Sequence, residues 1–296
     1  MNEFGRRSTA EQVTAGLDLR GRTALVTGCN SGIGFETMRV LALRGAHVIG
    51  AARTLDKARA ACGAVTGSTT PVVCELSDFD SVRACVAAVQ AGGEPLDMLI
   101  CNAGIMALPR LQQRYGLELQ FVTNHLGHFL LATRLRDQLA AARAGRVVLV
   151  SSLAHQFARS AGIEFDDLSG QQRYRPWRAY GQSKLANILF AKTLNRRLQA
   201  TNARANALHP GAISTGLGRH QGRVFSTLFN RVAPRLLKSV EQGAATTCYV
   251  ATRPELDAVG GAYFADCAEA TCSPQARDAE LGRRLWEFSE AFVEAH

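Results

Sequence analysis

The stretch RAYGQSKLANILF, from Arg178 to Phe190, places a tyrosine four residues before a lysine. Residues i and i+4 share one face of a helix, so Tyr180 and Lys184 are expected to lie side by side. A free phenol has a pKa of roughly 10, and a neighbouring ammonium group should lower it. Tyr180 could then exchange a proton with a hydroxyl or carbonyl group. The same spacing occurs by chance on many helices, so an ordinary surface pair is the alternative.

A pair of serines closes an apolar segment elsewhere in the chain. Residues 145–152, GRVVLVSS, are typical of a strand covered on both faces, and Ser151 and Ser152 end it. Folds built from parallel strands form their sites at the carboxyl ends of those strands. Ser152 is therefore a candidate site residue, whereas Ser151 is interpreted as a structural turn residue.

Three glycines, Gly28, Gly32 and Gly34, lie in the stretch TGCNSGIG between an apolar strand pattern and a helix pattern. Glycine lets the chain turn sharply and lets another group approach the backbone closely. The free N–H groups and the dipole at a helix start suit a phosphate, and Asn30 and Ser31 add polar groups at this edge. A plain loop is the alternative, but the position between strand and helix favours a nucleotide site.

Short β-branched runs alternate with longer helical patterns, and these elements would position the residues above. The predicted strands cover 22–28, 46–53, 70–76, 96–104, 145–152, 204–211 and 261–267. The predicted helices cover 35–45, 55–64, 79–93, 116–143, 180–200 and 240–252. This alternation predicts an α/β protein with a doubly wound (Rossmann) three-layer fold, whose central, mostly parallel sheet has about seven strands.

The composition fits one folded domain with no metal site. The chain has 296 residues, of which 47% are hydrophobic and 20% charged, and no apolar run approaches the ~20 residues that span a bilayer. None of the eight cysteines forms a Cys-x-x-Cys pair, which argues against zinc binding and favours reduced thiols in the cytoplasm. We expect a polar, partly disordered N-terminal arm at 1–19, without a signal peptide, and a single domain at 20–296.

The net charge of +9 and the pI of about 9.5 reflect an arginine-rich composition. The basic residues form no block with interleaved aromatic residues, so nucleic-acid binding is not expected. A soluble basic surface explains most of the charge, and an anionic cofactor would use a few of these groups.

Taken together, these motifs resemble the short-chain dehydrogenase/reductase family over about residues 20–290. The glycine loop matches the TGxxxGxG pattern of that family, and LICNAG matches its NNAG segment with Cys101 in place of the first asparagine. Finer features are similar to the retinol-dehydrogenase-like branch: NHLGHFLL, SSLAH, YGQSKLANILFAKTL, EQGAATTCYVAT and GGAYFADC.

The resemblance implies a catalytic tetrad of Asn124, Ser152, Tyr180 and Lys184. In it, Ser152 would hydrogen-bond the substrate oxygen, and Lys184 would also reach the nicotinamide ribose. Asn124 would bend its helix and hold a water on the proton path. The implied cofactor contacts are Gly28, Asn30, Ser31, Gly32, Ile33, Gly34, Arg53, Glu75, Leu76, Asn102, Ala103, Gly104, Tyr180, Lys184, Pro210, Gly211, Ile213 and Thr215. Glu75 departs from the family, which more often has aspartate there.

The end of the second strand, GAAR, bears on the choice of cofactor. An acidic residue at this position would hold the ribose 2′-OH of NAD, whereas Arg53 suits the 2′-phosphate of NADP. We therefore predict that NADP(H) is preferred over NAD(H). A solvated loop arginine is the alternative.

The expected function is NADP-dependent hydride transfer between the nicotinamide and a secondary alcohol, ketone or aldehyde of a bulky, largely apolar molecule. An epimerase or dehydratase, and a nucleotide-sensing module without turnover, are the alternatives. His125, His128 and His209 are interpreted as structural. The resemblance allows a homo-oligomer and leaves its size open.

The segment from about 216 to 239 occupies the position of a substrate lid. Its apolar stripe comprises Phe225, Phe229, Val232 and Leu236, flanked by Arg223, Arg231, Arg235 and Lys238. A lid over an apolar substrate, ordinary packing and contact with a membrane surface are the three interpretations, in that order.

Overall fold

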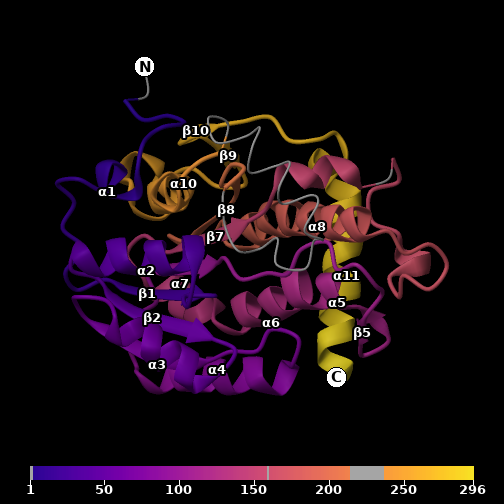
Figure 1. The fold of residues 1–296 in the computed structure, drawn as a ribbon, viewed down its shortest axis with the longest axis horizontal. Coiled ribbons are helices and arrows are strands. Elements are labelled where there is room, and N and C mark those ends of the chain that lie inside the picture. Colours follow the sequence, from indigo (N-terminus) through magenta and orange to yellow (C-terminus); the bar gives the residue numbers. More distant parts are fainter. Residues whose placement is uncertain (1–2, 159, 214–236) are drawn as a thin grey trace.

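A computed structural model describes residues 3–158, 160–213 and 237–296, and its centre is one eight-stranded sheet (Figure 1). The strand order is β10-β9-β8-β7-β4-β1-β2-β3, and every pairing is parallel except that of β10 with β9. The strands are β1 (Thr23–Thr27), β2 (His47–Ala52), β3 (Thr69–Val73), β4 (Met98–Cys101), β7 (Arg146–Val150), β8 (Arg204–His209), β9 (Tyr263–Ala265) and β10 (Ala268–Glu269). The predicted doubly wound sheet is confirmed, and β10 adds one strand to the seven expected.

Helices cover both faces of the sheet and enclose two separate hydrophobic cores. The helices on one face are α2 (Gly32–Leu43), α3 (Leu55–Gly63) and α10 (Val240–Thr252). Those on the other face are α4 (Phe79–Ala91), α6 (Gly127–Arg134) and α8 (Pro176–Arg197). The central strands β1, β4 and β7 are buried nearly throughout because both faces are covered, as their uniform apolar character predicts. Within the described ranges, no helix combines the length and apolarity needed to cross a bilayer.

The long helix expected at 116–143 is broken into shorter pieces. A small hairpin, β5 (Gln113–Arg114) and β6 (Leu117–Glu118), precedes α5 (Leu119–Phe121), a π-helical turn η1 (Val122–Leu126), α6 and α7 (Arg136–Ala141). The Tyr115–Gly116 turn has positive φ at both residues, and the Glu118 carboxylate accepts from the N–H of Phe121 at 2.9 Å. Hydrophobic periodicity alone does not reveal this turn and cap, which make the helical segment begin at Leu119 and not at residue 116.

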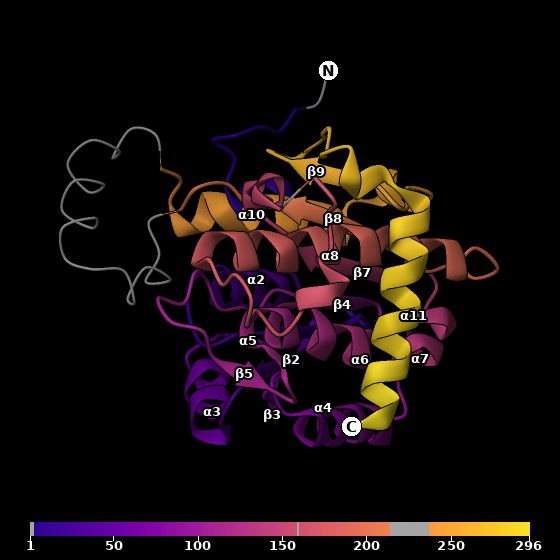
Figure 2. The same cartoon turned by 90° about the vertical axis from the view of Figure 1, so that its right-hand side faces the viewer.

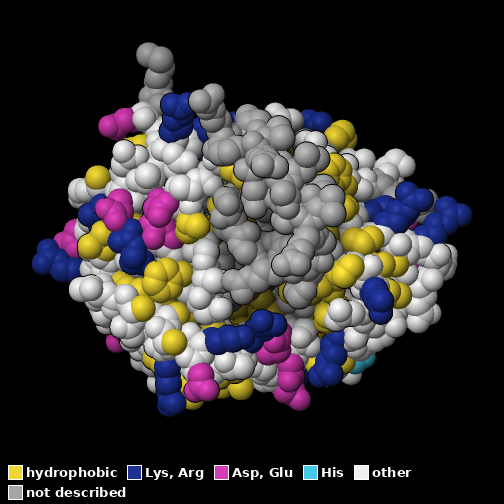
Figure 3. All heavy atoms as spheres, in the orientation of Figure 1, with side chains coloured by type: hydrophobic (Ala, Val, Ile, Leu, Met, Phe, Trp, Pro, Cys, Tyr) yellow, Lys and Arg dark blue, Asp and Glu magenta, His cyan; other side chains and the backbone are white. Residues whose placement is uncertain are grey.

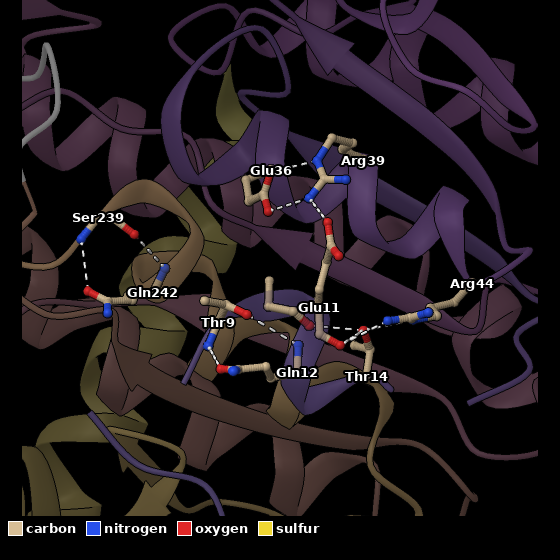
Figure 4. A network of polar contacts seen from close by, with 10 residues as sticks. Thr9, Glu11, Gln12, Thr14, Glu36, Arg39, Arg44, Ser239 and Gln242 are labelled. Carbon is tan, nitrogen blue, oxygen red and sulfur yellow. Dashed lines mark hydrogen bonds and ion pairs between the residues drawn. The ribbon is translucent and has the colours of Figure 1, made fainter. Parts of the chain in front are cut away.

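The N-terminal segment is packed against the domain, although the sequence suggested a loose polar arm. Its short helix α1 (Ala10–Val13) begins with a capping box at Thr9 and buries both of its terminal residues. Glu11 forms a 2.6 Å ion pair with Arg39 of α2, within a wider polar network (Figure 4). The segment has too few apolar residues to give a periodic signal, so only its tertiary contacts define it.

The C-terminal helix α11 (Ala279–Ala295) lies beyond the last predicted element, which ended at residue 267. It crosses α8 on the outer side of the core that contains α4, α6 and α8 (Figure 2). Its Trp286 contacts the rings of Phe129 and Phe190, with ring centroids 4.9 and 5.8 Å away. α11 therefore shields the apolar surface of α6 and α8.

Candidate active site

Ser152 stands at the carboxyl edge of the sheet, two residues after β7. It caps the 3₁₀ helix η2 (Leu153–Phe157), and its Oγ accepts a hydrogen bond from the N–H of Ala154 at 3.1 Å. Ser151 instead donates its hydroxyl to the carbonyl oxygen of Lys184 at 2.7 Å. The structural interpretation of Ser151 is confirmed, because this bond ties the end of β7 to α8.

Tyr180 and Lys184 lie on one face of α8, as their spacing predicts. The Lys184 Nζ atom is 5.7 Å from the centroid of the Tyr180 ring and donates to the carbonyl oxygen of Val150 at 2.9 Å. Lys184 is only 4% exposed, whereas Tyr180 is partly exposed. The arrangement is thus a buried ammonium beneath a partly exposed tyrosine, and not an ordinary surface pair.

The electrostatics of this pair differ from the expectation. Burial raises the pKa of Tyr180 to about 12, and a side-chain hydrogen bond with Ser152 opposes that rise. Burial also lowers the pKa of Lys184 to about 8. The predicted lowering of the phenol pKa by the ammonium is therefore not found. The Nζ atom donates its hydrogen bond to the Val150 carbonyl oxygen and lies over the Tyr180 ring. The loss of solvation on burial therefore has the largest effect on the pKa of the phenol.

Asn124 joins the loop after β4 to α8. It lies in the π-helical turn η1, which is the helix distortion that the family resemblance implies. Its Oδ1 accepts from the N–H of Ile105 at 2.8 Å, and its Nδ2 donates to the Ile105 carbonyl at 2.9 Å and to Ser183 Oγ at 3.0 Å. A Cβ on Gly104 would lie 3.0 Å from Asn124 Oδ1 and 3.5 Å from Lys184 Nζ. The side chains of Asn124 and Lys184 therefore both lie next to Gly104.

A buried threonine, which the sequence reasoning missed, connects this cluster to the glycine loop. Thr27 Oγ1 accepts from the N–H groups of Asn102 and Ala103 at 2.9 and 3.0 Å, and it lies 2.9 Å from Nε2 of His128. The Nδ1–H of His128 donates to the carbonyl oxygen of Asn124 at 3.0 Å. Burial lowers the pKa of His128 to about 4, so this imidazole stays neutral at physiological pH. Its predicted structural role agrees with these contacts.

We predict that Thr27→Val lowers the free energy of unfolding by about 2–3 kcal/mol, because buried N–H groups lose their acceptor. Thr27→Ser keeps the hydroxyl and serves as the matched control. Chemical denaturation measures both variants. A valine variant as stable as the wild type would show that this hub does not hold the ends of β1 and β4 together.

Three further histidines near the site have structural partners, of which His125 and His155 are buried and His209 is partly exposed. His155, whose role sequence reasoning did not identify, donates from Nδ1 to the Ser152 carbonyl at 2.7 Å and accepts from Ser273 N at 3.1 Å. The Nε2 of His125 lies 2.9 Å from Ser289 Oγ, and Nδ1 of His209 accepts from Leu153 N at 3.3 Å. Burial lowers the pKa of His125 to about 3 and that of His209 to about 4. None of them is a ready base at neutral pH.

The glycine loop at the start of α2 forms a narrow backbone cradle. Gly28 has a φ of 69°, which favours glycine, and a Cβ on Gly34 would lie only 2.3 Å from the Gly28 carbonyl oxygen. Ser31 is the N-cap residue, but its side chain makes no capping hydrogen bond. Asn30 and Ser31 are exposed, whereas Ile33 is buried. The first N–H groups of α2 are therefore not capped by the Ser31 side chain.

At the end of the neighbouring strand, Arg53 directly follows β2 and is exposed. The Glu75 carboxylate accepts from the N–H and hydroxyl of Ser77 at 3.1 and 2.9 Å, and the Leu76 side chain is in the core at 3% exposure. Leu76 is therefore buried as a whole residue, whereas Arg53 is exposed to solvent.

Pro210, Gly211 and Ile213 follow β8 beside the glycine loop. The virtual Cβ of Gly243 would contact both Ile213 and Ile33, which places these two predicted contacts together. Gly211 has a φ of 101° and lies against Lys238, which pairs with Asp266 at 2.6 Å. Thr215 and positions 216–236 of the predicted lid, with its apolar stripe, lie outside the described residues.

Comparison with known proteins identifies the family. The family model for short chain dehydrogenases matches residues 22–165. The chain is 43% identical to short-chain dehydrogenase TIC 32 A, chloroplastic, of Brassica napus, over 99% of this chain and 95% of that protein. This chain belongs to the short-chain dehydrogenase/reductase family. Human retinol dehydrogenase 13 is 41% identical, over 92% of this chain and 85% of its own length, which supports the retinol-dehydrogenase-like branch.

A solved structure supports the same assignment for the fold. The crystal structure of an uncharacterised protein from Mycobacterium paratuberculosis has a TM-score of 0.78 and 35% identity, and it covers 95% of this chain and 97% of that chain. As a short-chain dehydrogenase/reductase, the protein is an NAD(P)-dependent oxidoreductase.

The residues present fit the nicotinamide dinucleotide that this family uses. Gly34 lets α2 pack closely against the end of β1, because a Cβ at this position would collide with the backbone of Gly28. The start of α2 then offers its N–H groups to a pyrophosphate. Asn102, Ala103 and Gly104 follow β4 beside the glycine loop, where a Cβ on Gly28 would lie 3.0 Å from Ala103. The chain thus supplies a phosphate cradle on one side and the Tyr180 cluster on the other.

Proposed function

We propose that this protein is an NADP(H)-dependent carbonyl reductase or alcohol dehydrogenase acting on a bulky, largely apolar molecule. The observation that carries the proposal is the convergence of Ser152, Tyr180, Lys184 and Asn124 at the carboxyl edge of the sheet, next to the glycine loop. Two relatives named retinol dehydrogenases, human retinol dehydrogenases 13 and 14, support an apolar, ring-bearing alcohol or carbonyl compound as the substrate class.

In the reduction, Tyr180 would give its proton to the carbonyl oxygen of the substrate. Because its pKa is about 12, the phenol carries that proton throughout the neutral range. The Ser152 hydroxyl would make a second hydrogen bond to the same oxygen and stabilise its developing charge. Oxidation of the alcohol would return the proton to Tyr180. When bound, the nicotinamide supplies or accepts the hydride.

Lys184 and Asn124 support the proton transfer by Tyr180 without contacting the substrate oxygen themselves. With a pKa of about 8, Lys184 is charged at neutral pH and would stabilise phenolate character in Tyr180 once its proton leaves. Asn124 holds the loop at Ile105 against Ser183, whose hydroxyl donates to the Tyr180 carbonyl at 2.7 Å. Asn124 would therefore keep the loop after β4 aligned with α8.

A screen of ketones, aldehydes and alcohols with NADPH or NADP tests the proposal. Net change in the near-ultraviolet absorbance of NADPH is the expected result. Product formed without net oxidation or reduction would favour an epimerase or dehydratase. Cofactor binding without turnover over the whole screen would favour a nucleotide-sensing module.

The cofactor preference rests on Arg53. We expect Arg53→Ala to raise the KM for NADPH by about 10- to 100-fold, the worth of a charge-assisted contact to the 2′-phosphate of roughly 1.5–3 kcal/mol. Steady-state kinetics with both cofactors checks it, and NADH, which lacks that phosphate, is the matched comparison. A lower KM for NADH than for NADPH in the wild type would overturn the assignment.

A cytoplasmic location is also part of the proposal. All eight cysteines are buried and free of disulfides, which supports a reducing compartment. Oligomeric state is best measured directly, by light scattering of the purified protein.

A further inference from the structure

Exposed large hydrophobic side chains concentrate beside the candidate active site. Among the described residues they number five, and three of them are on η2 or at the start of α8. Their exposed fractions are 52% for Leu153, 58% for Phe157 and 41% for Trp177. Single exposed apolar residues are common on protein surfaces, but a contiguous group of them marks a place where something apolar binds.

The rings of this group run directly to the candidate acid/base residue. Trp177 and Tyr180 lie three residues apart on α8, with ring centroids 6.2 Å apart and an interplanar angle of 81°. Phe157 continues the series, with its centroid 6.3 Å from that of Trp177 at 88°. On the face shown in Figure 3, hydrophobic side chains gather toward the right, over the elements drawn in pink in Figure 1.

The backbone holds this group and the reacting groups on the same two elements. A Cβ on Gly181 would lie 2.4 Å from the Ala154 carbonyl oxygen and 3.2 Å from Phe157 Cβ, so η2 lies directly against α8. Ser152 caps η2, and Tyr180 precedes Gly181 on α8. The exposed side chains and the reacting groups are therefore carried by one closely packed pair of backbone elements.

The charge next to Trp177 is neutralised within the chain. The Arg178 guanidinium pairs with the Glu164 carboxylate at 2.6 Å, and both side chains are largely buried. Leu153, Phe157 and Trp177 themselves carry no ionisable group. The three side chains themselves therefore favour an apolar ring, and the exposed charge of Arg175 lies at the N-cap of α8, two residues before Trp177.

We propose that Phe157 and Trp177, together with Leu153 on the same 3₁₀ helix as Phe157, form an apolar wall that binds the ring-bearing part of an aromatic or alicyclic ketone or aldehyde. The carbonyl group of that molecule faces Ser152 and Tyr180, which lie at the inner end of the wall. The inference rests on the proposed function and adds to it the residues that select the substrate.

The test compares two methyl ketones that differ in their apolar part, 2-acetylnaphthalene and 2-butanone, with NADPH as the reductant. We expect Trp177→Ala and Phe157→Ala each to lower the ratio of kcat/KM for the naphthyl ketone to that for butanone by about 10- to 100-fold. Leu43→Ala is the matched control, because Leu43 is 48% exposed at the far end of α2 and should leave the ratio unchanged.

A binding measurement separates this inference from the proposed function. Trp177 is the exposed one of the chain's two tryptophans, so 2-acetylnaphthalene should quench its fluorescence in the wild type and not in Trp177→Phe. Quenching without any turnover would overturn the proposed function and support the wall. Turnover with an unchanged ratio in both alanine variants would overturn the wall and leave the function standing.

Discussion

Replacement of Tyr180 by phenylalanine should lower kcat for ketone reduction by about 100- to 10,000-fold, the range that a positioned general acid contributes. The phenol is the group that keeps its proton in the neutral range, because burial raises its pKa to about 12. The substitution removes only the hydroxyl and leaves the ring that contacts Trp177. Single-turnover kinetics with saturating NADPH measures the chemical step.

The matched control is Tyr174→Phe. Tyr174 lies six residues earlier in the same segment, and its hydroxyl donates to the Leu108 carbonyl at 2.6 Å, away from Ser152. That variant should lose a little stability and retain most of kcat. Equal losses in both variants would indicate a general structural effect, and full kcat in Tyr180→Phe would refute the assignment of Tyr180 as acid and base.

The fold was predictable where burial on both faces makes the strands uniformly apolar. The strand predicted at 22–28 is β1 at Thr23–Thr27, and the one predicted at 145–152 is β7 at Arg146–Val150. Turn residues and glycines mark the ends of these strands, so their order along the chain was readable. The parallel arrangement follows because a helical segment long enough to cross the sheet separates most successive strands.

The parts that were missed depend on contacts far apart in the sequence. α1 is short and is held by an ion pair across 28 residues, from Glu11 to Arg39. Within the helix predicted at 116–143, the π-helical turn ends just before Gly127, which lies close to Leu76. A Cβ on Gly127 would be 2.3 Å from the carbonyl oxygen of Leu76. Local hydrophobic periodicity carries no information about such approaches.

The candidate site shows the same division. The positions of Tyr180 and Lys184 followed from helix geometry, and the helix distortion at Asn124 followed from the family resemblance. The hub at Thr27 did not, because a threonine before a glycine has no chemical signature of its own. The pKa of Tyr180 was also predicted in the wrong direction, since a sequence shows the neighbouring charge but not the burial.

Replacement of Lys184 by methionine should separate activity from stability. We expect kcat to fall by about 100- to 1,000-fold, because the buried positive charge beneath Tyr180 is lost. Lys192→Met is the matched control on the same helix. Its Nζ donates to the Gly261 carbonyl at 2.8 Å on a different side of the domain, and this variant should retain kcat.

The stability of Lys184→Met should have its own pH dependence. The pKa of Lys184 is about 8 in the folded protein, below its ordinary value of 10.5. Between these values the unfolded chain binds more protons than the folded protein, so this lysine makes the free energy of unfolding rise with pH. The rise amounts to about 3 kcal/mol at 1.36 kcal/mol per pKa unit.

Methionine lacks this ionisation. As the pH rises from below 8 to above 10, the free energy of unfolding of the wild type should therefore increase by about 3 kcal/mol relative to that of Lys184→Met. At pH 7 the variant should be at least as stable as the wild type, because it does not bury a charge, although it loses the bond to Val150. Urea denaturation across this pH range measures the difference. A constant difference would mean that burial does not lower the pKa of Lys184 in the folded protein, whereas full kcat in Lys184→Met would reject its role beneath Tyr180.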